Sequence, residues 1–382
     1  MYDFTKEEQM ILSMVDDVCH DRIGPVAAEV DESDSFPWKL QELLAESGII
    51  SMLFEEKYGG AGVSLNCWLR CIERISQESC SVASIVTTAT MGSRPLLLAG
   101  SEAQKDRLIP DIASGDVRTC FALTEPQAGT HVANIATTAT KTNDGYVING
   151  SKVFATGGSV ADIFTIFAQV EESGTKKLTC FLVDRDADGL SIGRDEDKMG
   201  MRGSASCPLY FDNMEVPESA VVGKVGDGFD IVYGTLYGGR LCAAAFGIGL
   251  SKRAYAEALA YANSRVQFSQ TIGNFQAIRL KLADMEIGIK AAELLIDHAA
   301  TLYMKNDPEL RAYSSCTKIF CAELANKVTA DAIQIFGGYG YCKDYPVERL
   351  YRDARILTIF EGTSEILRTT LAKAALNENR KA

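Results

Sequence analysis

The order in which hydrophobic patterns follow one another is the feature that most constrains the fold of this chain. Apolar residues recur at helical spacing over 7–18, 39–53 and 64–75, which predicts helices in the first part of the chain. From 120 to 222 the pattern changes to short runs of β-branched and aromatic residues, bounded by polar residues and Gly. Long helical patterns then return, and Pro308 separates two of them. The chain is therefore expected to be helical, then β, then helical.

The strand-like runs in the middle predict one compact β unit. They are not separated by helical segments, which argues against βαβ units and favours a β barrel or sandwich. One of them, over 146–154, holds β-forming residues around an expected turn. The fold class is thus α+β, with three parts at 1–120, 121–227 and 228–382. The long helices of the third part are expected at 239–266, 275–304 and 313–336.

Charge and composition narrow the class of protein. The formal net charge is −13, whereas a general nucleic-acid binder is usually basic because phosphate contacts dominate its affinity. The N-terminus is acidic and polar, unlike a secretory signal, and no apolar run of about 18 residues predicts a membrane span. The 11 Cys show no CxxC spacing and only 3 His are present. We therefore expect reduced, buried cysteines, no metal site and a cytoplasmic protein.

A glycine-rich segment lies where the last long helical pattern stops. Its sequence is Gln334-Ile335-Phe336-Gly337-Gly338-Tyr339-Gly340-Tyr341. Glycine backbone at a helix end can approach a phosphate closely, and it can equally serve as the C-terminal stop of the helix. The segment is not a dinucleotide fingerprint, because no G-x-G-x-x-G follows a strand and opens a helix. Both interpretations stay open at this point.

A candidate base lies at Glu361, between an apolar run and Gly362. A carboxylate among apolar neighbours has a raised pKa, which suits a base that takes a proton near neutral pH. Alternatively, Glu361 complements the dipole of a helix that begins just after it. The residues alone do not decide between these two interpretations.

Two further segments could contact a ligand. The segment 122–130 offers the hydroxyls of two Thr and the exposed N–H groups of a turn, although a structural loop explains it as well. In the segment 264–276, Arg265 could pair with a phosphate and Phe268 could lie against a ring. A solvated Arg at the end of a helix is the alternative.

Together these segments resemble the acyl-CoA dehydrogenase family, over essentially the whole chain and in the family's order. The motifs that carry the resemblance are Leu123-Thr124-Glu125-Pro126, Asn149-Gly150-Ser151-Lys152, Arg265 with Gln267-Phe268, Gln334-x-x-Gly337-Gly338, and Arg352-Asp353-Ala354 leading to Glu361-Gly362-Thr363. The short-chain, butyryl-type members look most similar. The resemblance implies an N-terminal helical domain, a middle β domain and a C-terminal four-helix bundle.

The resemblance also implies a cofactor and partners. FAD would lie between the β domain and the C-terminal helices, and a neighbouring subunit would complete its site. Family members are usually homotetramers, viewed as pairs of dimers. Their substrate is an acyl-CoA thioester, and their electrons pass to an electron-transfer flavoprotein. Neither nucleic acid nor a membrane span is expected.

The reaction that the resemblance implies is α,β-desaturation of the thioester. Glu361 would take the α proton, and a hydride from the β carbon would pass to flavin N5. A flavin ribityl hydroxyl and the backbone N–H of Glu361 would polarise the thioester carbonyl, as in an oxyanion hole. Arg240 would lie near Glu361 and help to position it.

Further roles are carried onto individual residues by the same resemblance. Thr156 would bond near flavin N5, and Phe154 would cover one ring face. The other residues expected to contact the cofactor are Phe121, Leu123, Thr124, Gly129, Thr130, Arg265, Phe268, Gln276, Gln334, Gly337, Gly338, Thr363 and Glu365. The residues expected to contact the substrate are Thr130, Tyr237, Arg240, Phe360 and Gly362. Arg265, Phe268 and Gln276 would reach the cofactor of the other subunit.

Several departures from the family's pattern bear on the substrate. His131 and Tyr237 stand where acidic residues are usual near the CoA entrance, which leaves the acyl group undetermined. Gly239 occupies the position of the base in isovaleryl-type members, so Glu361 has no rival there. Residues 81–90 lack the Arg of glutaryl-CoA enzymes.

Three functions remain possible on these grounds. The first is an acyl-CoA dehydrogenase that passes electrons to an electron-transfer flavoprotein. The second is an enoyl-CoA reductase that runs the same chemistry in reverse in an anaerobe. The third is a silent flavoprotein scaffold, against which Glu361 argues because such a protein needs no base.

Overall fold

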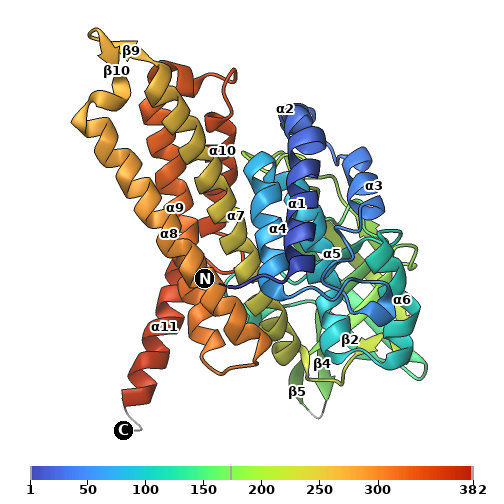
Figure 1. Ribbon diagram of the computed structural model, residues 1–382. Helices are drawn as coiled ribbons and strands as arrows, with labels where there is room; N and C mark the ends of the chain where they lie inside the picture. The colour runs from blue at the N-terminus through green and yellow to red at the C-terminus, as the bar shows by residue number, and fades with distance from the viewer. Residues whose placement is uncertain (1, 173, 380–382) are drawn as a thin grey trace.

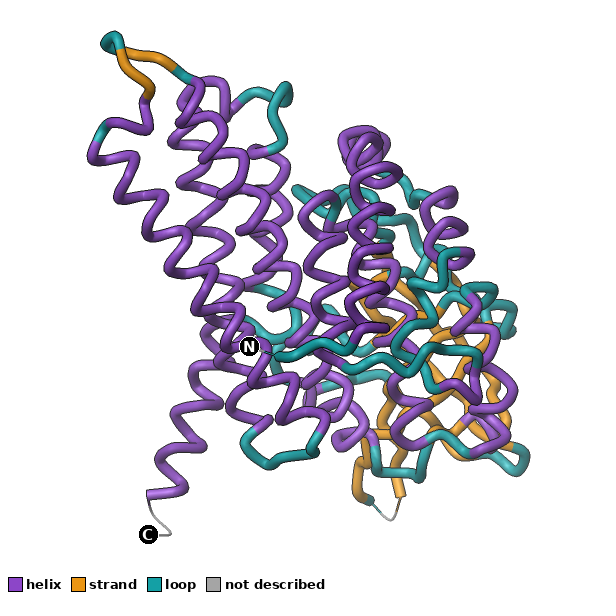
Figure 2. Tube along the Cα trace, viewed as in Figure 1, coloured by secondary structure: helices purple, strands orange, loops and turns teal. Residues whose placement is uncertain are grey.

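The computed structural model describes residues 2–172 and 174–379, and its parts follow the predicted order. The first part is helical and contains α1 (Lys6–Val18), α2 (Ala27–Ser33), α3 (Trp38–Glu46), α4 (Leu65–Glu78), α5 (Cys80–Ala99) and α6 (Glu102–Ser114). The last part contains α7 (Gly228–Ser264), α8 (Gln276–Met304), α9 (Leu310–Phe336), α10 (Val347–Arg355) and α11 (Ser364–Asn379). The sheet lies on one side of the molecule and the long helices α7, α8 and α9 lie on the other (Figure 1, Figure 2).

Local sequence sets where the N-terminal helices begin and end. Thr5 accepts a hydrogen bond from the Glu8 N–H, and the Glu8 carboxylate accepts one from the Thr5 N–H, so a capping box starts α1. The helix expected over 39–53 ends earlier, at Glu46, because Gly48 adopts φ +71° and turns the chain. The apolar residues that follow are buried, so their spacing reflects a packed turn and not a longer helix.

The middle part is one sheet with the strand order β6-β7-β3-β2-β4-β5-β8, and β1 also pairs with β4. Its strands are β1 (Thr119–Ala122), β2 (Thr138–Lys141), β3 (Gly145–Thr156), β4 (Ile163–Glu172), β5 (Thr175–Asp184), β6 (Leu190–Ile192), β7 (Ser206–Pro217) and β8 (Val221–Val222). Over 119–172 and 174–222 no α-helix interrupts them. The sheet holds a hydrophobic core of its own, around Phe164 and Phe181, which is distinct from the main core of the helices.

Strand β3 corrects one expectation, because it runs unbroken where a turn was predicted. Its register against β7 shifts between Ile148 and Gly150, and again after Lys152. Gly150 has φ +146°, and a Cβ there would lie 2.5 Å from Thr137 Oγ1, so a bulge accommodates the residues expected to turn. At the second irregularity Phe154 has φ +56° and leaves the sheet with 65% of its surface exposed.

Helix α7 is long and apolar enough, by length and composition alone, to cross a membrane. However, 72% of its most apolar stretch is buried inside the structure, as in the core helix of a globular protein. It packs against α4, α5, α8 and α9. The third part is therefore built around α7, which also carries Arg240.

All 11 cysteines are free thiols, and each is buried except Cys316 and Cys342. Burial raises the pKa of the Cys19 thiol to about 12, so this thiol stays protonated. Among the residues that the structure describes, no His, Cys, Asp or Glu cluster could hold a metal ion.

Candidate active site

Glu361 lies in the short loop before α11 and adopts φ +55°. Its Oε2 atom is buried and has no hydrogen-bond partner in the described part of the chain. Burial raises the pKa of Glu361 to about 7, although the charges of Arg240 and Lys318 act in the opposite direction. Thr363 caps the following helix, because its Oγ1 accepts a hydrogen bond from the Ile366 N–H at 3.3 Å. The Glu361 carboxylate is thus left to titrate near neutrality, as a general base requires.

Two buried cations surround this carboxylate. Arg240 on α7 is 7% exposed, and its Nη1 lies 3.4 Å from the Ser315 hydroxyl. Lys318 on α9 is fully buried, and its Nζ donates to the carbonyl of Gly362 at 2.7 Å. Burial lowers the pKa of Lys318 to about 8, against the effect of the nearby Glu361 charge. Lys318 therefore both fixes the loop beside Glu361 and carries positive charge close to it.

Lys318 is a site residue that the sequence analysis missed. A Lys within a helical pattern is normally solvated, so its type suggests a surface position. The one available signal is its place in the pattern of α9, four residues after Ser314 and three before Cys321, both fully buried.

Helix α7 approaches the carboxylate through a glycine. A Cβ on Gly239 would lie 2.3 Å from Glu361 Oε2 and 2.6 Å from Met91 Cε. Any side chain at 239 would therefore displace the carboxylate. On the same helix the Tyr237 ring lies 5.6 Å from Arg240 Cζ. The predicted substrate residues on α7 thus lie close to the candidate base.

The sheet carries a second group of predicted residues around the end of β3. The loop after β1 is tied to this strand, because the Val153 N–H donates to the Thr124 carbonyl at 2.8 Å. Four of the predicted residues are exposed: Phe154, Thr156, Gly129 and Thr130. Two are turned inward: Leu123, which is buried, and Phe121, whose ring packs 5.2 Å from that of Phe167.

A buried ion pair anchors this loop. Lys152 Nζ lies 2.7 Å from Glu125 Oε1 and 3.2 Å from the Leu123 carbonyl. The Glu125 carboxylate also accepts from the N–H groups of Ala136 and Thr137, at 2.6 and 3.1 Å. Burial acts to raise the pKa of Glu125, but Lys152 and these hydrogen bonds lower it overall. The motif residues Glu125 and Lys152 thus stabilise the loop from inside the protein, while Gly129 and Thr130 of the same loop are exposed.

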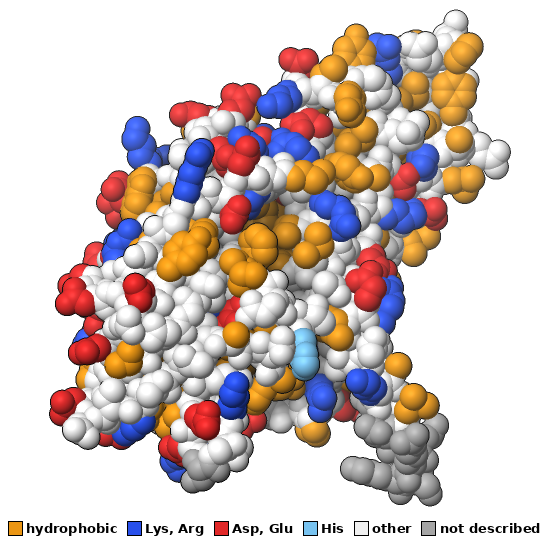
Figure 3. Space-filling view, turned by 180° about the vertical axis from the view of Figure 1, so that it is seen from behind, with side chains coloured by type: hydrophobic (Ala, Val, Ile, Leu, Met, Phe, Trp, Pro, Cys, Tyr) orange, Lys and Arg blue, Asp and Glu red, His pale blue; other side chains and the backbone are white. Residues whose placement is uncertain are grey.

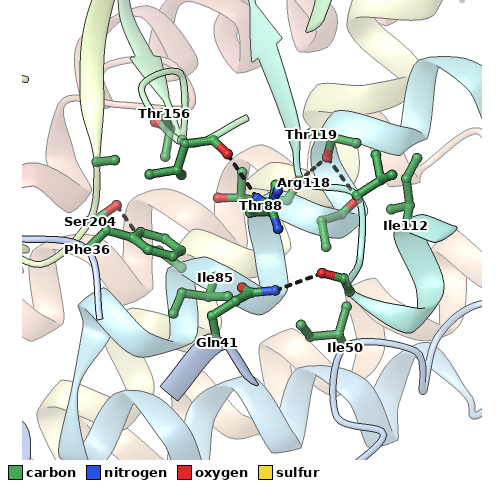
Figure 4. A pocket seen from close by; sticks show the side chains of 17 residues that line it. Phe36, Gln41, Ile50, Ile85, Thr88, Ile112, Arg118, Thr119, Thr156 and Ser204 are labelled. Carbon is green, nitrogen blue, oxygen red and sulfur yellow. Dashed lines mark hydrogen bonds between the residues drawn. The ribbon is translucent and has the colours of Figure 1, made fainter. Parts of the chain in front are cut away.

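A small cavity lies between the helical part and the sheet, with Thr156 in its wall (Figure 4). Its volume is about 30 Å³, and Ile85 of α5 and Gln41 of α3 also line it. Gln41 donates to the Gly115 carbonyl at 3.3 Å beside it. A space of this size holds a water molecule or two, and it is too small for a flavin or an acyl group.

The remaining predicted residues gather at the other end of the long helices. Arg265 precedes the hairpin β9 (Val266–Gln267) and β10 (Gln270–Thr271), which Figure 1 shows at the tip of the bundle, opposite the sheet. Arg265, Gly337 and Gly338 line a cavity of about 440 Å³ there. Three predicted residues are exposed and lie outside its lining: Phe268, Gln276 and Gln334.

Gly337 and Gly338, near the hairpin, both end a helix and leave space open beside the backbone. Gly337, at φ +62°, ends α9. A Cβ on Gly337 or Gly338 would meet nothing within 4 Å, so both backbones border open space. Within one chain, the residues near Glu361 and those of the hairpin end form two separate groups. Seen from behind, apolar side chains gather over the middle of the molecule (Figure 3).

Comparison with known proteins places every part of the chain in one family. The family models for acyl-CoA dehydrogenases match the N-terminal domain over residues 5–116, the middle domain over 120–214 and the C-terminal domain over 226–376. The chain belongs to the acyl-CoA dehydrogenase family. Enzymes of this family use FAD and act on CH–CH bonds, so the protein is an FAD-dependent oxidoreductase of that class. The family, the three-part fold and the cofactor predicted from the sequence are confirmed.

Individual relatives match over nearly the whole chain. An acyl-CoA dehydrogenase of Bacillus subtilis (strain 168) is 41% identical, over 97% of this chain and 98% of the relative. A 3-(aryl)acrylate reductase of Clostridium sporogenes is 39% identical, over 98% and 99%. A chain in the solved structure of the electron transferring flavoprotein of Acidaminococcus fermentans superposes with a TM-score of 0.94 at 35% identity, over 98% and 99%.

Proposed function

We propose that this enzyme desaturates an acyl-CoA thioester between its α and β carbons, with Glu361 as the base. The observation that carries the proposal is the state of the Glu361 carboxylate. Glu361 is half-buried, and its Oε2 atom is fully buried with no hydrogen-bond partner among the described residues. Arg240 and Lys318 carry positive charge close to it, and burial raises its pKa to about 7. Such a carboxylate can take a proton from a weakly acidic carbon near neutral pH.

The residues present fit FAD. The open glycine backbone at Gly337 and Gly338, with Arg265 beside it, suits a diphosphate. Phe154 and Thr156, exposed beside the loop after β1, suit a flat ring. When bound, FAD supplies a hydride acceptor. These two groups of residues lie at opposite ends of the folded subunit. We therefore infer that a second subunit brings its hairpin end to the sheet of the first, and that the subunits form a homotetramer built as a dimer of dimers.

Several residues of the chain have separate roles in the removal of the α proton. Glu361 receives that proton on a carboxylate oxygen, and Gly239 leaves room for the carboxylate against α7. Lys318 holds the Gly362 carbonyl and so sets the direction of the loop. Arg240 supplies positive charge that favours the ionised form of Glu361 before the proton is taken.

Reduction of an enoyl thioester is the second candidate. The same residues serve both directions, and the 39% identical relative is a 3-(aryl)acrylate reductase. An electron-transfer flavoprotein is the electron partner that we infer in either direction, supported by the similarity to a chain in the solved structure of such a flavoprotein. Turnover of saturated and unsaturated thioesters with that partner distinguishes the two directions.

The first experiment is reduction of the bound flavin by acyl-CoA thioesters, followed as bleaching of its visible absorbance. Glu361→Gln keeps the shape of the side chain and removes the base. We expect it to retain FAD and to bleach at least about 100-fold more slowly than the wild type. The matched control is Glu171→Gln, an exposed carboxylate on β4 that should bleach normally. Equal bleaching rates in Glu361→Gln and the wild type would refute the assignment of the base.

A further inference from the structure

Helix α10 holds a buried carboxylate, Asp353, that the proposed reaction does not use. Only 4% of its surface is exposed, and burial raises its pKa to about 6. The neighbouring Arg352 forms its ion pairs with Asp31 and Glu348 instead. Among the described residues, the Asp353 side chain takes part in one hydrogen bond, which it accepts from the Met201 N–H at 2.6 Å. A buried carboxylate with so few partners costs free energy, so stability alone does not explain it.

Met201 lies in the loop between β6 and β7, and this loop is packed closely against α10. Met201 has φ +48°, a conformation that residues with a Cβ rarely adopt. A Cβ on Gly200 would lie 2.4 Å from the backbone carbonyl of Arg352, so the two backbones touch there. The Arg352 guanidinium also donates to the Met199 carbonyl at 3.1 Å. Three consecutive residues of the loop are therefore fixed to Arg352 and Asp353.

The other end of this loop reaches the part of the sheet that is expected to meet the flavin. The N–H of Gly157, which follows Thr156, donates to the Ala205 carbonyl at 2.9 Å. Ser204 lines the same small cavity as Thr156 (Figure 4), and its hydroxyl is hydrogen-bonded to that of Ser84 on α5 at 2.9 Å. The loop thus connects α10 to the residue that follows Thr156.

Asp353 is also close to the candidate base along the chain. Glu361 lies eight residues further on, after the end of α10 and a short 3-10 turn over Ile356–Thr358. The Asn326 side chain of α9 donates to the Ala354 carbonyl at 2.7 Å, which fixes the C-terminal end of α10. A shift of α10 would therefore move the Glu361 loop with it.

We propose that Asp353 is a positioning residue, which fixes the Glu361 carboxylate relative to the flavin by holding the Met201 N–H. The inference rests on the proposed function, because Glu361 must reach the α carbon while the β carbon faces the flavin. The role belongs to the oxygen that accepts the hydrogen bond and not to the charge of the carboxylate. A displacement of about 1 Å in such a geometry can slow a reaction by about 100-fold.

The first test compares Asp353→Leu with Asp353→Asn in the FAD-loaded enzyme. Leu fills a similar volume without an acceptor, whereas Asn keeps an oxygen for the Met201 N–H. At saturating thioester, we expect flavin bleaching to slow by about 10- to 100-fold in Asp353→Leu, with little change in KM. Asp353→Asn should stay close to the wild-type rate. The control is Asp344→Leu, at an exposed carboxylate before α10, which should bleach normally.

Two readouts without turnover separate positioning from a general loss of structure. A thioester in which sulfur replaces the β carbon can give its α proton to Glu361 but has no hydride to pass on. Its enolate, lying against oxidised flavin, absorbs at long wavelength, and at equal FAD content this band should be weaker in Asp353→Leu and restored in Asp353→Asn. In the protein without FAD, amide hydrogen exchange over 356–363 should be faster in Asp353→Leu than in the wild type.

The outcomes separate this inference from the proposed function. If no thioester bleaches the wild-type flavin, or Glu361→Gln bleaches normally, the proposed function is wrong. If both behave as expected but Asp353→Leu bleaches like the wild type, the role of Asp353 is wrong and the proposed function stands. Equal slowing in Asp353→Asn and Asp353→Leu would overturn the assignment to the hydrogen bond.

A variant of the loop keeps the test decisive if Asp353→Leu fails to fold or loses FAD. Gly200→Ala leaves Asp353 intact and adds a Cβ that would meet the backbone of α10 at 2.4 Å. It should push the loop away from α10 and slow bleaching as Asp353→Leu does. A wild-type bleaching rate in Gly200→Ala would refute the proposal.

Discussion

At the scale of single residues, the chemistry depends on how the surroundings of Glu361 balance. Burial disfavours the charged carboxylate and raises its pKa, while Arg240 and Lys318 lower it, and the result is a pKa of about 7. A base acts only when it is ionised. Flavin reduction by substrate should therefore speed up as pH rises through about 7 and then level off, as long as the α proton transfer limits the rate.

Lys318→Met tests this balance. Because Lys318 lowers the pKa of Glu361, its removal should raise that pKa and move the midpoint of the pH profile to higher pH. The profile is measured as the rate of flavin bleaching against pH. Lys318→Arg keeps the charge and should restore most of the midpoint. Lys327→Met, an exposed position on the same helix, is the control for helix α9. A midpoint that stays or falls in Lys318→Met would show that this cation does not act on Glu361.

The roles of single residues are also what the sequence predicts least well. Glu361 could be singled out because a carboxylate next to an apolar run is unusual. Lys318 could not, since a charged residue in a helical pattern suggests solvent unless its neighbours in space are known. The predicted roles of Phe121 and Leu123 stay predictions, and the structure turns both side chains inward.

At the scale of elements, the loop after β1 depends on the Glu125–Lys152 pair. Both side chains are almost fully buried, and removing one partner of such a pair leaves an uncompensated charge that costs about 3–5 kcal/mol. Lys152→Met should therefore lower the urea midpoint of unfolding strongly and also weaken FAD retention, because the loop loses its anchor. Adding Glu125→Gln in the same chain should recover part of the loss.

Lys141→Met serves as the matched control for that experiment. Lys141 lies on the neighbouring strand β2 and pairs with Glu218 at 2.7 Å, but both side chains are exposed. Exposed ion pairs contribute little, so the unfolding midpoint should barely move. Equal shifts in the two variants would mean that burial of the Glu125–Lys152 pair is not what stabilises the loop.

The elements show why the fold was more predictable than its details. Helical and strand periodicity gave the three-part order correctly, since burial of one face repeats along each element. The early end of α3 at Glu46 and the continuous strand β3 depend on how Gly48 and Gly150 are used. A glycine permits a helix stop, a turn or a bulge, and which one forms is decided by contacts such as Thr137 against Gly150.

At the scale of the whole molecule, two observations favour an assembly. The hairpin end carries Arg265 and a cavity of about 440 Å³, yet it lies away from the sheet of its own chain. It also follows the C-terminal end of α7, whereas Glu361 lies beside Gly239, nearer the start of that helix. Helix α8 also shows an exposed apolar stripe: Leu280, Ile287 and Leu294 are 59%, 67% and 56% exposed and lie seven residues apart, hence on one face. Three large apolar side chains in a row on one helix suit burial against an apolar surface of another subunit.

The net charge of −13 also bears on how the protein binds its cofactor. FAD and CoA are anions, so the overall field of the protein opposes them, and binding must rest on local groups such as Arg265 and the backbone at Gly337. If those groups come from a second subunit, loss of the assembly should also cost the cofactor. Sequence patterns within one chain can name these residues, but they cannot say which subunit's sheet they reach.

Ile287→Asp tests this coupling of assembly and cofactor. A charge in the centre of the α8 stripe would have to be buried on association, so the variant should sediment as a smaller species. It should also release FAD on dilution, seen as a fall in the ratio of flavin to protein absorbance. Met10→Asp is the control, because Met10 is 74% exposed but stands alone on α1. If the variant sediments like the wild type, α8 is not part of the interface. If it sediments as a smaller species yet keeps its FAD, a single chain completes the cofactor site.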